Sequence, residues 1–379
     1  MRNLRPPAPV QARMDDIDTQ TPETAAEIGI VAPEQAAEEA GLHYVHATDP
    51  GIRRERDADG WRYIGPSGKP VTDEKTLARI AKLAIPPAYA DVWICKDARG
   101  HLQAVGTDAR GRRQYRYHAD FRAIRDSNKF GHMLDFARAL PKVRATIGQH
   151  MALRGMPREK VLATVVYLLE TTLIRVGNDE YAKDNASFGL TTLESRHVAI
   201  AGSEMRFRFK GKSNKEWNLR LKDRRVAKLV KAAQELPGQH LFQYVGEDGT
   251  PHAVTSSDVN AYLRDIAGTP VTAKDFRTWA GTVLAATALA EFDAFETPTA
   301  AKKNVKAAIE RVAAQLGNTP TICRKCYVHP EIVGAYMDKA LALTIAARVE
   351  HAIEDAGELH PDEQAVLAFL KERIEAAPA

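Results

Sequence analysis

The stretch LGNTPTICRKCY, residues 316–327, decides how this part of the chain folds and where its chemistry is expected. Gly317 follows a long amphipathic segment and is therefore predicted to cap the end of a helix. Thr319 and Pro320 then start a second, short helix, since proline suits the first helical turn. Tyr327 falls late on that short helix. Its hydroxyl could serve a functional site, or the ring could lie half-buried in the core with the hydroxyl in water.

The composition is that of a soluble globular protein. The 379 residues are 44% hydrophobic and 27% charged, and this length suggests two domains. No run approaches the ~18 apolar residues that a membrane span needs, and the N-terminus lacks the apolar core of a secretory signal. Three cysteines do not make a disulfide framework in a chain of this size. We therefore expect a cytoplasmic protein with no membrane partner.

The charge is unevenly distributed along the chain. The net charge is +4, but residues 1–40 hold eight acids and three bases, a net charge of −5, so the remainder carries +9. Residues 110–129 hold seven lysines or arginines against two aspartates, with tyrosines between them. A charge run is often only a solvated surface, but arginines interleaved with tyrosines are typical of contact with a phosphate backbone.

Three segments are predicted along the chain. Residues 1–40 are rich in Pro, Ala, Glu and Gln and are predicted to be a mostly disordered extension. Residues 41–121 form a small strand-rich domain, with one helix capped by Thr72. Its strands are expected at 61–63, 92–94 and 102–105, between turn signals. Residues 122–379 form a larger, mainly helical domain. The predicted fold class is therefore α+β.

The larger domain contains one β-hairpin. Hydrophobic residues alternate with basic ones from 197 to 222, and the tip of the hairpin carries Lys212. A lysine at such a tip is usually just solvated, but it could also reach into a groove and deliver a proton. The preceding helix is predicted over 159–176, which places Arg175 at its C-terminal end. Further helices are expected at 224–236, from Ser257 or Asp258 to 266, at 330–354 and at 361–376.

Another helix is predicted from Thr272 to Phe292. Thr272 and Asp275 fit the capping pattern in which the residue three positions on closes the first turn. Arg277 then falls in the first turn, where the helix dipole disfavours a cation. An arginine in this place indicates an anion site rather than a stabilising role.

Five residues in order resemble the active site of the type IB DNA topoisomerases, in particular the compact poxvirus-like and bacterial group. They are Arg175 in LIRVGNDEYAKDN, Lys212 in FRFKGKSNKEW, Arg277 in KDFRTW, and Asn318 and Tyr327 in LGNTPTICRKCY. The resemblance runs from about residue 42 to 336 and includes IPPAYADVWI (85–94) and GHLQAVGTDARGRRQYRYH (100–118).

This resemblance implies a reaction. Tyr327 would attack a backbone phosphorus and form a 3′-phosphotyrosyl ester. Arg175, Arg277 and Asn318 would donate to the phosphate oxygens, and Lys212 would protonate the leaving 5′-oxygen. The family usually has His at the position of Asn318, but an amide can also donate. The resemblance implies relaxation of supercoiled duplex DNA by strand rotation and religation, with no metal, nucleotide or other cofactor.

The resemblance also implies DNA contacts in both domains. Predicted contacts to the grooves, to the phosphates or around the active site come from Arg113, Gln114, Tyr115, Arg116, Tyr117, Tyr181 and Lys274. Ordinary strand alternation or a solvated surface is the alternative, above all for Tyr117 and Tyr181. We expect a monomer that is associated with the nucleoid, whose two lobes clamp the duplex about a hinge near residues 121–129.

Two rival functions remain open. A tyrosine recombinase or integrase shares this chemistry, but it usually has His three residues before the second arginine, where this chain has Lys274. A DNA-binding protein with a weakened site is the second rival, since the usual histidine is replaced. The pair Cys323 and Cys326 lacks the four ligands that zinc requires and is predicted to pack as small hydrophobic residues.

Overall fold

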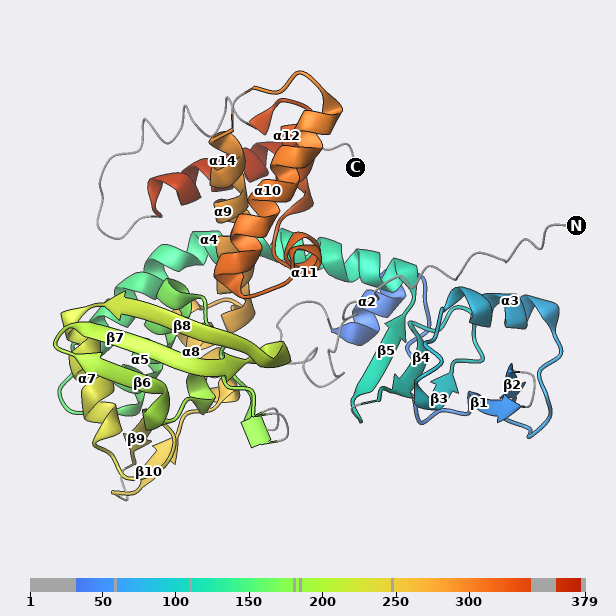
Figure 1. Cartoon of the computed structure of the whole chain (residues 1–379), viewed down its shortest axis with the longest axis horizontal. Coiled ribbons are helices and arrows are strands. Elements are labelled where there is room, and N and C mark those ends of the chain that lie inside the picture. Colours follow the sequence, from blue (N-terminus) through green and yellow to red (C-terminus); the bar gives the residue numbers. More distant parts are fainter. Residues whose placement is uncertain are drawn as a thin grey trace, which may run out of the picture. The chain divides into compact units, whose positions relative to one another are not determined.

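The structure is a computed structural model of the chain, and it describes residues 32–57, 60–109, 111–179, 182–183, 186–246, 249–292, 294–341 and 359–375. These residues form two compact units, which divide between Asn128 and Lys129. The division falls inside helix α4 (Ala119–Met151), which continues through it (Figure 1). None of the helices within the described ranges has both the length and the apolar character to cross a membrane.

The first unit is built on a five-stranded antiparallel sheet with the order β2-β1-β3-β4-β5. The strands are β1 (Ile52–Asp57), β2 (Gly60–Ile64), β3 (Ala90–Ile94), β4 (Leu102–Thr107) and β5 (Arg113–Tyr117). Helix α3 (Glu74–Lys82) covers one face, where Ile80 packs on the sheet. On the other face Tyr115 contacts Leu102 and Val105. The three strands predicted from the sequence are confirmed, and β1 and β5 are additional.

The predicted disordered extension is too long at its C-terminal end. Pro33–Glu39 form helix α2, because Ala36 and Ala37 are buried against Leu42 and Phe121. The segment is mainly polar, so this pair of small apolar residues gives no clear signal in the sequence. Both residues are buried by a single face of the short helix. Residues 1–31 lie outside the described residues.

Two predicted helix caps are displaced by one to three residues. Helix α3 is capped by Asp73 rather than Thr72, since the Asp73 carboxylate accepts a hydrogen bond of 2.8 Å from the Thr76 amide. Helix α8 is capped by Thr255 rather than Ser257 or Asp258. Asp258 instead closes the capping box from inside the helix, accepting the Thr255 amide at 3.0 Å. In both places several capping residues follow one another, and only the backbone geometry selects among them.

The second unit packs its helices around α9 (Ala273–Ala290), which is buried on most of its faces. The other elements are α5 (Arg158–Thr172), η1 (Leu190–Thr192), η2 (Ser195–His197), β6 (Val198–Ala201), β7 (Glu204–Gly211), η3 (Lys212–Asn214), β8 (Lys215–Lys222), α7 (Arg224–Gln234), β9 (Gln243–Val245), β10 (Pro251–Ala253), α8 (Ser256–Ala267), α10 (Pro298–Leu316), α11 (Pro320–Cys326), α12 (Pro330–Met337) and α14 (Pro361–Glu375). The protein is thus a helix-rich mixed α/β molecule with small antiparallel sheets and an N-terminal strand unit.

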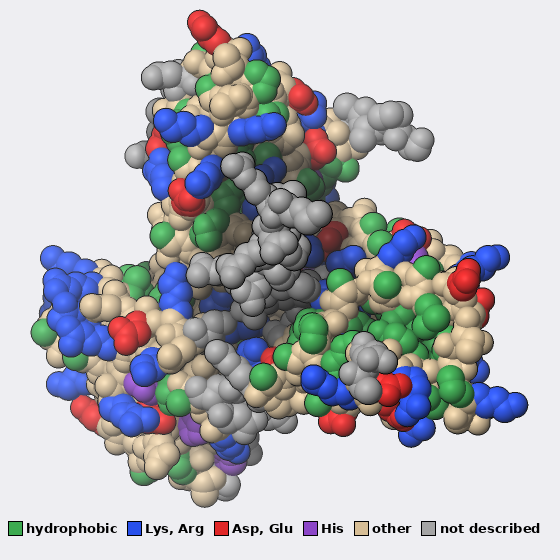
Figure 2. Space-filling view, turned by 45° about the vertical axis from the view of Figure 1, so that its right-hand side comes forward, with side chains coloured by type: hydrophobic (Ala, Val, Ile, Leu, Met, Phe, Trp, Pro, Cys, Tyr) green, Lys and Arg blue, Asp and Glu red, His purple; other side chains and the backbone are tan. Residues whose placement is uncertain are grey.

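The predicted hairpin is confirmed as β7 and β8, joined in an antiparallel sheet with β6. Met205, Phe207 and Phe209 point into the core, and the positions that alternate with them carry the basic residues Arg206, Arg208 and Lys210. The charges of Arg208 and Arg220 lower the pKa of Arg206 on this face. Figure 2 shows lysine and arginine side chains gathered at the left of the view, where β7, β8 and α7 lie.

Two helices end earlier than the sequence predicts. Helix α5 stops at Thr172, because Leu173 adopts a left-handed conformation with φ of 56°. Arg175 therefore lies in the loop after the helix rather than on it. Helix α12 ends at Met337, not at residue 354, and residues 342–358 lie outside the described ones. Hydrophobic periodicity continues past both ends, so it does not mark them.

One side of the last helix, α14, belongs to the core. Val366, Phe369 and Leu370 are buried, and the acidic first turn contributes the buried Glu363. The acidic residues at the start of α14 favour an exposed helix. Only the tertiary contacts of the Glu363 carboxylate reveal that this end is partly buried.

Candidate active site

Arg277 is held at the centre of the second unit by the ends of two other helices. Its guanidinium donates to the carbonyl of Leu173, at the end of α5, and to that of Leu316, at the end of α10, at 2.7 Å. Carbonyls at helix C-termini carry partial negative charge, and they replace water around a side chain that is only 3% exposed. Burial lowers the pKa of Arg277 to about 10, so the side chain remains charged at neutral pH.

Helix α9 sets this position through its N-terminal cap. The predicted pairing of Thr272 with Asp275 is confirmed, since the Asp275 carboxylate accepts the Thr272 amide at 2.8 Å and its hydroxyl at 2.9 Å. The helix begins at Ala273, which makes Arg277 its fifth residue. It therefore lies in the second turn, not in the first as predicted.

Tyr327 lies directly after α11, in contact with α9. The predicted caps are confirmed, because Gly317 is left-handed with φ of 64° and Thr319 caps α11. A Cβ atom added at Gly281 would lie 2.6 Å from the Tyr327 carbonyl oxygen, so α9 admits the tyrosine backbone only because this residue is glycine. The Thr282 hydroxyl donates to the same carbonyl at 3.3 Å.

The ring of Tyr327 is surrounded by cations. The Arg277 guanidinium carbon lies 5.1 Å from the ring centroid. Burial raises the pKa of Tyr327, but the charges of Arg277, Arg175 and Lys274 and a hydrogen bond from Arg277 outweigh it and lower the pKa to about 8. A larger fraction of this phenol than of an ordinary tyrosine is therefore ionised near neutral pH, which favours a role as a nucleophile.

Arg175 and Asn318 complete the cluster. The Arg175 guanidinium donates to Oδ1 of Asn318, which orients the amide. The amide nitrogen Nδ2 of Asn318 and Nε of Arg277 are buried and have no hydrogen-bond partner within the described residues. Buried donors are rarely left unpaired, so these two indicate a place for an acceptor that a ligand would bring.

The loop that carries Arg175 is fixed from behind. The carbonyls of Arg175 and Val176 accept the amides of Leu190 and Thr191, at 2.9 Å and 2.7 Å. Gly177 and Gly189 touch each other here, since a Cβ on Gly189 would lie 2.5 Å from the Gly177 Cα. The Arg175 backbone is thus set by main-chain contacts with η1, although it lies outside any helix.

Lys212 lies in η3 at the tip of the hairpin, as predicted. The returning strand carries Trp217, whose ring stacks on Phe209 with centroids 5.9 Å apart. A Cβ on Gly317 would lie 2.6 Å from that Trp217 ring. The hairpin therefore packs against the turn that precedes Asn318 at a position close to its tip, two residues from the pair of Gly211 and Lys215.

Known proteins match over most of this chain. Residues 118–351 match the family described as eukaryotic DNA topoisomerase I, catalytic core, and residues 60–108 match bacterial DNA topoisomerase IB, N-terminal domain. The DNA topoisomerase 1B of Acanthamoeba polyphaga mimivirus is 32% identical over 285 residues, which are 73% of this chain and 85% of the relative. That of Vaccinia virus (strain Copenhagen) is 23% identical over 282 residues, 71% of this chain and 85% of the relative.

The chain belongs to the type IB DNA topoisomerases. This confirms the family and the enzyme class predicted from the sequence. The recombinase alternative is set aside, because the matches cover both units and name the topoisomerase in each. The matches do not assign roles to individual residues.

In this topoisomerase the predicted DNA contacts of the first unit lie on β5. Arg113 is exposed, whereas Gln114 is buried and donates to Asp108 at 3.0 Å. Arg116 donates to the Ala84 carbonyl at 3.1 Å. Tyr115 and Tyr117 lie with their ring centroids 6.2 Å apart and nearly parallel. Gln114 and Arg116 therefore have structural contacts of their own, and Arg113 is the most accessible of the five.

The remaining residues that the sequence singles out are Lys274, Tyr181 and the cysteine pair. Lys274 is the second residue of α9 and acts on the Tyr327 phenol through its charge. Tyr181 lies outside the described residues. Cys323 is fully buried in α11, as predicted for a small hydrophobic residue. Across the described ranges, no group of three or more His, Cys, Asp or Glu side chains is arranged to hold a metal ion.

Two kinds of residue in the candidate site were not predicted from the sequence. Gly281 and Thr282 contact the Tyr327 backbone, and a Gly-Thr pair inside an otherwise apolar helix is a signal that could have revealed them. Lys129 was counted with the basic run, but its ammonium donates to the carbonyl of Cys326, just before the tyrosine. Only the tertiary structure reveals that contact, because nearly 200 residues separate the two.

Proposed function

We propose that this topoisomerase relaxes supercoiled duplex DNA with Tyr327 as its nucleophile. The phenol oxygen bonds to a backbone phosphorus while the bond from phosphorus to the 5′-oxygen breaks. The products are a 3′-phosphotyrosyl ester and a free 5′-hydroxyl, and the free end rotates before it attacks the ester and restores the strand. Because the ester keeps the energy of the phosphodiester, religation needs no ATP.

One observation carries this proposal: a tyrosine with a lowered pKa lies beside two buried donors that have no acceptor among the residues that the structure describes. The donors are Nε of Arg277 and Nδ2 of Asn318. An unpaired buried N–H group costs about 1–3 kcal/mol, so it is retained where a ligand pairs it during function. The non-bridging oxygens of a DNA phosphate are acceptors of the required kind and charge.

The surrounding side chains divide the work. Arg175 and Arg277 supply permanent positive charge for the oxygens of the pentavalent transition state. Lys212 gives a proton to the departing 5′-oxygen, which is a poor leaving group when unprotonated. The proton of Tyr327 leaves to solvent, which the lowered pKa of about 8 favours.

Asn318 replaces the family's usual histidine as a neutral donor. Arg175 occupies its oxygen, so the amide nitrogen is the atom left for the phosphate. This supports an active site and argues against the alternative of a weakened DNA-binding protein. We also assign the second unit, which contains this site, to the catalytic fold that topoisomerases of type IB share with tyrosine recombinases.

DNA binding on the first unit is assigned to the face and edge of β5, through Arg113, Gln114, Tyr115, Arg116 and Tyr117. The accessible Arg113 supports this, because exposed arginines supply most phosphate contacts. Tyr181 and Lys274 contribute from the second unit. The enzyme acts as a monomer at the nucleoid, and each unit contributes contacts to the duplex.

The test is covalent capture of DNA by matched tyrosine variants. Tyr327→Phe is expected to abolish both plasmid relaxation and the covalent adduct trapped by denaturant, while salt-sensitive DNA binding remains. Tyr336→Phe is the control, because its hydroxyl only accepts a hydrogen bond from Asn304 at 2.8 Å. Adduct formation by Tyr327→Phe at the wild-type rate would remove the nucleophile assignment.

A further inference from the structure

The first turn of α14 is tied to the helix that carries Arg277. Glu363 is 7% exposed and accepts the indole N–H of Trp279, on α9, at 3.0 Å. Arg144, on α4, donates to the same carboxylate through both terminal nitrogens, at 2.7 Å and 2.9 Å. Helix α14 lies beyond residues 118–351, the part of the chain that matches the topoisomerase core family.

The carboxylate is firmly fixed in its charged form. Burial raises the pKa of Glu363, but hydrogen bonding and charge from Arg144, with further hydrogen bonds from His360 and Trp279, lower it overall. Arg144 also donates to Glu170, on α5, at 2.7 Å. The pKa of Glu170 is raised, mainly because burial disfavours the charged form of its carboxylate. Glu363 therefore joins α4, α9 and α14 through an ion pair that is largely withdrawn from water.

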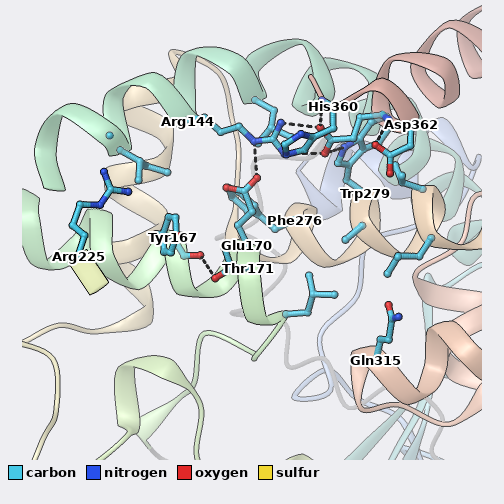
Figure 3. Close-up of a pocket in the computed structure, with 18 residues that line it drawn as sticks. Arg144, Tyr167, Glu170, Thr171, Arg225, Phe276, Trp279, Gln315, His360 and Asp362 are labelled. Atoms are coloured by element: carbon cyan, nitrogen blue, oxygen red, sulfur yellow. Dashed lines mark hydrogen bonds and ion pairs between the residues drawn. The ribbon is translucent and has the colours of Figure 1, made fainter. Parts of the chain in front are cut away.

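A cavity lies beside this network, as Figure 3 shows. It has a volume of about 600 Å³ and is bordered by Phe276, Trp279, Glu170 and Glu363. Trp279 is 2% exposed, so packing holds its ring, and the hydrogen bond to Glu363 fixes the direction of its indole N–H.

The same cavity borders the residues that hold Arg277. Leu173, whose carbonyl accepts from Arg277, lines it, and so does Gln315, which precedes the second acceptor Leu316. Trp279 itself follows Arg277 by two residues on α9. The contact between Trp279 and Glu363 is thus a polar link between α14 and the part of α9 that carries Arg277.

We propose that Glu363 is a positioning residue for cleavage, holding Arg277 against Tyr327 through Trp279 and the register of α9. This rests on the proposed function of Tyr327. Glu363 does not touch the reacting atoms. It fixes the orientation of α9, and that orientation sets how closely the guanidinium approaches the phenol. The C-terminal helix thereby becomes part of the catalytic apparatus.

The proposal is tested by the pH dependence of single-turnover cleavage at saturating DNA. In the wild type the rate should rise with a midpoint near pH 8, where Tyr327 ionises. Arg277, Arg175 and Lys274 are the charges that lower that pKa, so a displaced Arg277 moves the midpoint upward, toward the ordinary value of 10.0. Trp279→Phe and Glu363→Gln should both show this shift and a fall of about tenfold or more in rate at pH 7.5.

Trp279→Phe leaves Glu363 in place and replaces the indole, with its N–H donor, by a smaller aromatic ring, so it decides the question if Glu363→Gln does not fold. Arg373→Gln is the control, because it breaks the 3.2 Å pair with Glu331 at the other end of α14. It should leave both rate and midpoint unchanged. A wild-type profile in Trp279→Phe, or an equal loss of rate at every pH, would overturn the proposal. The proposed function fails separately, if the wild type forms no adduct through Tyr327.

Discussion

The active-site region of the second unit and strand β5 of the first hold their functional side chains in different ways. Arg277 is 3% exposed and bound to two main-chain carbonyls at helix ends. Arg113 on β5 is exposed. A buried arginine is preorganised to stabilise a transition state, whereas an exposed one adds charge that salt can screen. Changes in the first region should alter the rate on bound DNA, and changes in the second should alter binding.

The largest effect should come from Arg277→Lys. Lysine lacks the forked donors that reach the carbonyls of Leu173 and Leu316 while facing the phosphate. We expect single-turnover cleavage at saturating DNA to fall by ~10²–10³. The unpaired carbonyls should also lower the free energy of unfolding by about 1–3 kcal/mol, measured by denaturant titration.

The control for this substitution is Arg311→Lys on α10. Arg311 forms an exposed 2.7 Å pair with Glu291, and such pairs contribute little. Its rate and stability should match the wild type. If Arg277→Lys cleaved as fast as Arg311→Lys, the contrast between buried and exposed arginines would have no catalytic meaning.

A smaller effect is expected at Asn318. Asn318→Ala removes a neutral donor, which is weaker than a charged one, and should slow cleavage by about 10–100-fold. Asn318→His keeps a donor and should retain activity. Asn318→Asp keeps the shape but offers only acceptors beside Arg175, so it should be slower than the alanine variant. Quenched-flow cleavage rates at one pH would rank the three, and an unchanged rate in Asn318→Ala would refute the assignment.

The smallest effect on chemistry should come from Arg113→Gln. It should weaken DNA binding and reduce the slope of log affinity against log salt by about 1, while cleavage at saturating DNA stays unchanged. Lys82→Gln removes the same charge from α3, which covers the opposite face of the sheet. That control should keep the wild-type slope. Equal slopes for both variants would show that β5 is not the DNA-binding face.

Much of the site could be predicted because its key turns have local signals. A glycine after an amphipathic run marks the end of α10, and the pairing of Thr272 with Asp275 marks the start of α9. Alternation of apolar and basic residues identifies the hairpin that carries Lys212. Each of these depends on contacts between residues a few positions apart, so the sequence contains the full pattern.

The remainder depends on contacts between distant segments. Helix α5 ends at Thr172 rather than at residue 176, and the carbonyl of Leu173 just after it accepts from Arg277, which lies over 100 residues away. The position of α14 likewise depends on Glu363 meeting Arg144 and Trp279. Neither arrangement leaves a periodic signature. The sequence predicts which residues carry charge, but not which charges are buried.

The close contact between Gly281 and the Tyr327 carbonyl has a consequence for fidelity. In the proposed mechanism, the 3′-phosphate of the broken strand stays bonded to the phenol of Tyr327 during strand rotation. The main chain at Tyr327 is in close contact with Gly281 on α9. The esterified phosphorus can therefore move only by torsion of the Tyr327 side chain. The two ends are thus returned to the same point in space however many turns are released, and the break is resealed in register.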